Sequence, residues 1–67
     1  MGYFIVNRAA NYYNVKRTFL SGYRPRGYTV LEGARLDAQV VANRYHETMR
    51  IVDENGIVIE KIKCEVK

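Results

Sequence analysis

Residues 29–45, TVLEGARLDAQVVANRY, carry the strongest structural signal in the chain. Apolar side chains recur there three and four residues apart, which is the spacing of one face of an α-helix. They are Leu31, Ala34, Ala38, Val41, Ala42 and Tyr45. Thr29 and Glu32 match a capping box, in which each side chain bonds the other residue's backbone N–H. The pattern predicts one amphipathic helix over residues 30–45, and Gly33 within it indicates either a close backbone approach or simple tolerance.

Two strand-like runs follow the helix and flank a hairpin signal. Residues 48–52 and 57–62 are rich in β-branched side chains. Asn55-Gly56 lies between them, and Asn-Gly is the strongest short-range indication of a hairpin. These runs therefore predict an antiparallel hairpin, with Gly56 in the left-handed backbone conformation if the loop has three residues.

The register of this hairpin decides which side chains lie under the helix. With a three-residue loop, Arg50 lies opposite Glu60 and forms a cross-strand ion pair with it. The apolar side chains placed under the helix are then Met49, Ile51, Ile57 and Ile59. A two-residue loop would shift the register by one and reverse the two faces. The apolar residues also change parity after Glu60, which a β-bulge near Lys61 would explain.

The first twenty residues predict two more strands, because residues 3–7 and 12–20 are aromatic and β-branched. Residues 9–11 would form the turn between them, although they lack the usual Gly or Pro. We therefore expect an α+β fold over residues 1–67 as one domain, with a single helix packed on an antiparallel sheet. The expected order is ββαββ, or βαββ if residues 10–20 are irregular.

The positive charge is concentrated in the first half of the chain. The net charge is +4, and the residues before Glu32 include five lysines and arginines but no acidic residue. From Glu32 onward six basic residues face seven acidic ones. A surface of one sign favours an anionic partner, either a nucleic acid or an acidic protein face. The alternative is that the charge serves only solubility.

The segment 21–28, SGYRPRGY, interleaves arginine with tyrosine and contains the only proline, which indicates a loop. Guanidinium groups bind phosphates or carboxylates bidentately, and tyrosine rings stack on bases or anchor protein interfaces. We predict a partner-binding or nucleic-acid-binding surface made of Arg8, Lys16, Arg17, Tyr23, Arg24, Arg26 and Tyr28. Alternatively, Tyr23 and Tyr28 cover the end of the core and the arginines are only solvated. Phe4 and Phe19 are expected to point inward.

A second surface is predicted on the outer face of the helix. Leu36 and Val40 are four residues apart and lie opposite the core stripe, with Arg44 beside them. An apolar pair on an outer face can seat a partner protein or a second copy of the chain in a homodimer. The alternative is that a loop or strand folds over the pair and makes it an extension of the core.

Catalysis is not expected from this sequence. His46 is the only histidine and falls at the helix end, where it can cap carbonyls or interact with the helix dipole. Cys64 is the only cysteine, has no histidine near it in sequence, and is expected to be a buried structural thiol. No metal-ligand cluster or phosphate-cradling glycine loop occurs, so we expect no enzyme, metal or cofactor. No stretch reaches membrane-spanning length, and we expect a soluble cytoplasmic protein with no membrane partner.

Residues 27–34, GYTVLEGA, and 49–56, MRIVDENG, resemble in layout small phage and mobile-element proteins that inhibit host machinery, including some anti-CRISPR proteins. The shared layout is a turn, a helix, a strand, Asn-Gly and a second strand. The resemblance implies an inhibitor that acts in the host cytoplasm by occluding a host protein or nucleoprotein complex. Many anti-CRISPR proteins are acidic DNA mimics, whereas this basic chain would hold the complex or its guide RNA. The alternatives are a stand-alone nonspecific RNA- or DNA-binding module and a homodimeric protein–protein adaptor.

Overall fold

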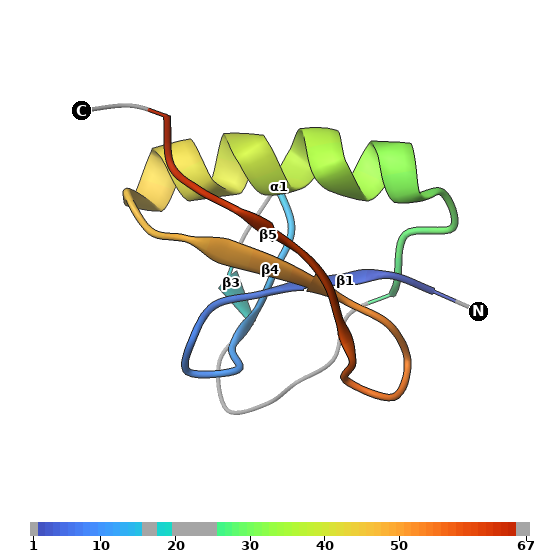
Figure 1. The fold of residues 1–67 in the computed structure, drawn as a ribbon. Helices are drawn as coiled ribbons and strands as arrows, with labels where there is room; N and C mark the ends of the chain where they lie inside the picture. The colour runs from blue at the N-terminus through green and yellow to red at the C-terminus, as the bar shows by residue number, and fades with distance from the viewer. Residues whose placement is uncertain (1, 16–17, 20–25, 66–67) are drawn as a thin grey trace.

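The computed structural model describes residues 2–15, 18–19 and 26–65. Within them, one helix lies across one face of an antiparallel sheet, as Figure 1 shows. In chain order the elements are β1 (Phe4–Val6), β2 (Tyr12–Tyr13), β3 (Thr18–Phe19), α1 (Leu31–Tyr45), β4 (Met49–Val52) and β5 (Val58–Ile62). The strands are arranged in the order β3-β2-β1-β4-β5. The predicted α+β class, with one helix on an antiparallel sheet, is confirmed.

The second predicted strand differs in detail, because residues 12–20 contribute two short strands and not one. Tyr12 pairs with Phe19 and Tyr13 pairs with Thr18, so β2 and β3 form an antiparallel pair. The sheet therefore has one strand more before the helix than the ββαββ order predicted. Alternation at period two identifies strand-like residues but not a turn among them, and residues 14–17 contain no Gly or Pro that would mark one.

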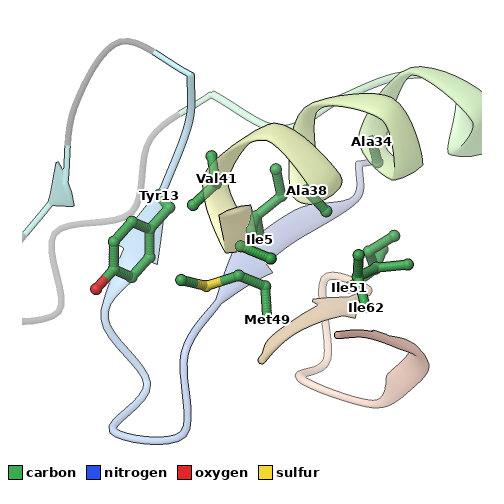
Figure 2. Close-up of a cluster of buried hydrophobic side chains, with 9 residues drawn as sticks. Ile5, Tyr13, Ala34, Ala38, Val41, Met49, Ile51 and Ile62 are labelled. Atoms are coloured by element: carbon green, nitrogen blue, oxygen red, sulfur yellow. The ribbon is translucent and has the colours of Figure 1, made fainter. Parts of the chain in front are cut away.

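The core lies between α1 and the sheet. The buried helix residues are Ala34, Ala38, Val41 and Ala42. They pack on Ile5, Tyr13, Met49, Ile51 and Ile62 from the strands, and Figure 2 shows most of this cluster. Three of the four buried helix residues are alanines, and their small side chains let the helix backbone approach the sheet closely. The predicted core stripe is confirmed for these four positions, whereas Tyr45 is 40% exposed.

The two ends of α1 do not use the predicted side-chain caps. The N-cap residue is Val30, in an extended conformation with no side-chain cap hydrogen bond, so the Thr29–Glu32 capping box was wrong. The chain turns into the helix one residue later than that motif requires. At the other end His46 adopts the left-handed conformation with φ 53°, and its backbone N–H donates to the carbonyl oxygen of Ala42. Backbone geometry therefore ends the helix at both termini.

Gly33 has open space beside it, since a Cβ built there would have no atom within 4 Å outside the helix backbone. Replacing Gly33 by alanine is expected to raise the free energy of unfolding by about 0.5–1 kcal/mol, because alanine loses less backbone entropy in a helix. Urea denaturation followed by circular dichroism measures this change. Gly56→Ala is the contrasting control: Gly56 has φ +80°, so alanine there should lower stability. A loss of stability in Gly33→Ala would mean that another segment needs this space.

The β4–β5 hairpin has a register that the sequence did not predict. Ile51 pairs with Glu60 and Arg50 pairs with Lys61, because a bulge leaves Ile59 without a partner on β4. The predicted pairings of Ile51 with Ile59 and Arg50 with Glu60 were therefore wrong, and the bulge lies before Glu60. The loop itself was predicted correctly in one respect, since Gly56 has the expected positive φ.

The bulge also corrects the face assignment. Ile57 and Ile59 were expected under the helix, yet they are 61% and 41% exposed, while Ile62 takes the buried position opposite Met49. Glu60 now lies on the helix side, where its Oε1 accepts a hydrogen bond of 2.7 Å from Arg35 Nε. Arg50 and Lys61 consequently lie beside each other on the opposite face of the sheet without an acidic partner between them.

A second, smaller cluster lies on the sheet face away from the helix. Phe4, Val6 and Val52 are buried there, and Tyr12 packs edge-on against Phe4 with ring centroids 5.8 Å apart. Phe4 is thus buried as predicted, although on this second face. The side chain of Phe19 lies outside the described residues.

Candidate functional site

One end of the sheet carries a hollow with a strongly basic lining, which we call the basic hollow. It is lined by Arg8, His46, Glu47, Thr48, Arg50, Lys61 and Lys63 and has a volume of about 520 Å³. These residues come from the ends of β1 and β5, the start of β4 and the turn that follows α1. Four cationic side chains and one carboxylate therefore share one concave surface.

Strand pairing explains how these residues meet. Arg50 is paired with Lys61 on β5 and with Val6 on β1. Arg8 lies two residues beyond Val6, and Lys63 lies two residues beyond Lys61, so both extend the basic surface past the strand ends. Each pairing depends on the hairpin register that the bulge at Ile59 sets. A register shift of one residue would place Glu60 beside Arg50 and remove much of the positive charge.

Arg50 is the most unusual member of the hollow. Its Nη1 atom is buried and has no hydrogen-bond acceptor among the described residues. A buried donor without a partner costs about 1–3 kcal/mol, and more when it is charged. Arg50 is partly exposed and lines the hollow, so a small movement of its side chain would let a bound anion supply the missing acceptor. Arg8, Lys61 and Lys63 are exposed and would add attraction at the rim.

Three acidic side chains outside the hollow are held elsewhere on the molecule. Glu32 and Glu60 both contact Arg35 on the helix side of the sheet, at 3.4 and 2.7 Å. The hydrogen bond with Glu60 is the main cause of the raised pKa of Arg35. Asp53 is engaged in the β4–β5 loop, where its Oδ1 accepts from two backbone N–H groups. The positive charge of the hollow is therefore not neutralised by these carboxylates.

The predicted seven-residue surface is divided by the structure. Arg8 lines the basic hollow, whereas Arg26 and Tyr28 line a separate depression that also includes Asp37. The two depressions lie toward opposite ends of β1, since Tyr28 pairs with Tyr3 and Arg8 follows the strand's other end. The remaining predicted residues lie outside the described part of the chain: Lys16, Arg17, Tyr23 and Arg24.

Tyr28 has a structural role in the fold. Its backbone exchanges two hydrogen bonds with Tyr3, of 2.8 and 2.7 Å, and its side chain is half-buried. Burial raises the pKa of the Tyr28 hydroxyl well above its usual range, and a hydrogen bond to the Asp37 carboxylate raises it further. Tyr28 thus links Tyr3, just before β1, to the helix, through its backbone on one side and its hydroxyl on the other. Its packing against the core matches the alternative reading, in which this tyrosine covers the end of the core.

The predicted outer surface of the helix is exposed as expected. Leu36 and Val40 are 67% and 46% exposed. Arg44 points its guanidinium to the backbone carbonyl of Val15, which fixes this arginine against the segment after β2. The apolar pair remains a candidate interface, with one arginine beside it already engaged by the chain itself.

Cys64 and His46 form a contact that the sequence did not indicate. The Cys64 Sγ lies 3.9 Å from the His46 Nδ1, although 18 residues separate them. No histidine is near Cys64 in sequence, but in the fold the end of α1 lies beside the chain after β5 and brings His46 to Cys64. His46 belongs to the hollow as well, which places the thiol close to the basic surface.

Sequence reasoning missed Arg50, Lys61 and Lys63. Summing charge over the second half of the chain concealed them, because several acidic residues of that half, among them Glu32, Asp53 and Glu60, are engaged on other surfaces. One usable signal was present: Lys61 and Lys63 are spaced two apart, which puts both on one side of a strand. The contribution of Arg50 required the pairing register, which local sequence does not determine.

Comparison of the chain with protein-family models, curated proteins and solved structures found no match. Two features of the described residues bear on other classes of site. They contain no group of three or more histidine, cysteine, aspartate or glutamate residues placed to hold a metal ion. They also contain no helix that is long and apolar enough to cross a membrane. Within the described part of the chain, the basic hollow points to a ligand.

Proposed function

We propose that this protein binds nucleic acid without catalysis, and that the basic hollow holds phosphate groups of the bound strand. The observation that carries the proposal is the convergence of Arg8, Arg50, Lys61 and Lys63 on one concave surface, with the acidic side chains Glu32, Glu60 and Asp53 engaged elsewhere. Lysine and arginine contacts to phosphates supply most of the affinity in nonspecific nucleic-acid binding.

The ligand chemistry favours phosphate over an acidic protein face. Arginine guanidinium groups match the oxygens of phosphate bidentately, and Arg50 offers a donor atom that has no described acceptor. A nucleic acid also repeats its charge at short intervals, so several cations around the hollow can be engaged at the same time. The same contacts would serve a free strand or a strand within a nucleoprotein complex in the cytoplasm. In the second case the bound domain would act as a phage-type inhibitor that occludes the complex.

Fluorescence polarisation with short labelled RNA and DNA, single- and double-stranded, tests the proposal. The affinity should fall steeply as salt is raised to the physiological range. In Lys61→Gln/Lys63→Gln, the slope of log affinity against log salt should become shallower by about 1.4 for single strands, since each lost phosphate contact removes about 0.7. Arg35→Gln/Arg44→Gln is the matched control, because it removes the same charge on the helix side and should change the slope little.

Three results would contradict this proposal. One is the absence of binding to any nucleic acid at low salt. Another is an equal loss of affinity in the control double variant, which would mean that only net charge matters. The third is a salt-insensitive interaction with a protein that is abolished by Leu36→Ser/Val40→Ser. That outcome would support the second candidate function, a protein–protein adaptor, which the exposure of Leu36 and Val40 favours.

A further inference from the structure

We propose that the basic hollow is a site for one dianionic phosphate group with three free oxygens, and that Arg50 is its central ligand. This inference rests on the proposed function and deepens it, because it names the part of a nucleic acid that is recognised. The expected ligand is the terminal phosphate of a strand. Free inorganic phosphate shares the same chemistry and is the other source of such a group.

The first argument for a terminal phosphate is the partial burial of Arg50. Arg50 is only partly exposed and lines the hollow, and its Nη1 is buried without a partner, so a ligand that binds this guanidinium must lie within the hollow. A phosphodiester within a strand has a nucleotide on each side and two free oxygens, and both neighbours must pass the rim for it to enter. A terminal phosphate has one ester link and three free oxygens, so it can enter end-on. The geometry therefore favours a strand end over a strand interior.

The second argument, which favours a dianion over a monoanion, is the positive charge around Arg50. Arg8, Lys61 and Lys63 surround the recessed guanidinium, and Glu47 is the single carboxylate of the lining. A dianion gains more than a monoanion from such a convergent set, because Coulomb attraction scales with ligand charge. Other lining groups can add hydrogen bonds, from the Thr48 hydroxyl and the His46 imidazole.

The third argument is that the hollow is large enough for a phosphate and its sugar. Its volume of about 520 Å³ is many times the roughly 30 Å³ that one water molecule occupies in the liquid. A phosphate and the sugar attached to it can therefore both be accommodated. The open side lets the remainder of the strand leave the protein, so the length of the strand is not limited by the site.

The test uses single-stranded oligonucleotides labelled at the 3′ end, identical except for a 5′-phosphate or a 5′-hydroxyl. Fluorescence polarisation at physiological salt should show about tenfold tighter binding of the phosphorylated strand, since hydrogen bonds to charged groups contribute about 1.5–3 kcal/mol and each 1.4 kcal/mol is tenfold. A 5′-hydroxyl strand one nucleotide longer controls for the added charge. It should bind like the shorter 5′-hydroxyl strand.

The variant that addresses the site is Arg50→Gln, with folding checked by circular dichroism. It should abolish the preference for the 5′-phosphate, so that the phosphorylated and the 5′-hydroxyl strand bind with similar affinity. Lys61→Gln should reduce the preference in the same direction and serves if Arg50→Gln does not fold. Arg35→Gln removes one arginine from the helix side and should keep the full preference.

The outcomes separate this inference from the proposed function. Equal binding of both strand ends by the wild-type protein would overturn the phosphate site and leave nucleic-acid binding intact, whereas no binding of either strand would overturn both. A titration with inorganic phosphate, in which chloride is adjusted to keep the ionic strength constant, shows whether the bound group is the strand end or the free ion. Displacement of the phosphorylated strand by millimolar phosphate, lost in Arg50→Gln, supports the site. Thermal stabilisation by phosphate without any strand preference would support a site for the free ion.

Discussion

Replacing Ile51 by alanine is expected to lower the free energy of unfolding by about 3–4 kcal/mol, within the usual range for a fully buried large-to-small substitution. Ile51 is completely buried at the centre of β4, between Ile5 on β1 and Glu60 on β5, and lies beneath α1. A domain of this size rarely has more than about 3–5 kcal/mol of stability from its core. The variant should therefore be largely unfolded at room temperature, as measured by circular dichroism and urea denaturation.

Ile57→Ala provides a control that also tests the hairpin register. The three-residue-loop register predicted from the sequence placed Ile51 and Ile57 together under the helix, so both truncations would then be similarly severe. In the structure Ile57 is 61% exposed, and its truncation should change stability by no more than about 0.5 kcal/mol. Comparable losses in the two variants would contradict the bulge at Ile59 and, with it, the composition of the basic hollow.

The parts of the fold that were predictable are those set by local pattern. The helix was located within one residue at its start because its apolar residues repeat at helical spacing over fifteen residues. Asn55-Gly56 located the hairpin for a similar reason, since few conformations other than a tight turn use that pair. Both signals need only residues that are adjacent in sequence. Neither depends on the rest of the chain.

The hairpin register was not predictable in this way, because it depends on competition between two apolar sets on one strand. Ile57 and Ile59 alternate in one phase, while Ile62 belongs to the other. The structure buries Ile62 opposite Met49, beside the helix, and accommodates the change of phase by the bulge. The choice also lets Glu60 reach Arg35 from the helix. These gains arise from tertiary contacts, so an alternation rule applied to the strand alone cannot weigh them.

The same limit applies to the candidate site. The prediction from sequence singled out basic residues, and one of them, Arg8, lines the hollow. It grouped them by position along the chain, however, whereas the hollow combines Arg8 with three basic residues from the second half. Charges that are balanced in sequence become separated in space once alternate residues face opposite sides of a sheet. The Cys64–His46 contact was missed for a related reason, since it joins segments that only the packing of α1 beside β5 brings together.

The second large effect is expected at Asn7, which holds the β1–β2 turn in place of the usual Gly or Pro. Its buried side chain accepts from the backbone N–H groups of Ala9 and Asn11 at 3.0 and 2.9 Å. Its Nδ2 contacts the Tyr13 hydroxyl at 3.1 Å. Ala10 within the turn adopts φ 64°, which is unfavourable for alanine, so the turn depends on these bonds. Asn7→Ala should therefore lower the free energy of unfolding by about 2–3 kcal/mol.

Asn7→Asp separates these bonds from side-chain volume. A carboxylate keeps the acceptor for Ala9 and Asn11 and can accept a hydrogen bond from the Tyr13 hydroxyl, so urea denaturation should show a much smaller loss than for Asn7→Ala. Equal losses would mean that the turn does not depend on this acceptor. Because Arg8 directly follows Asn7, the same turn fixes one wall of the basic hollow. Under conditions where Asn7→Ala remains folded, weaker binding of the phosphorylated strand is therefore expected, since Arg8 loses the turn that positions it.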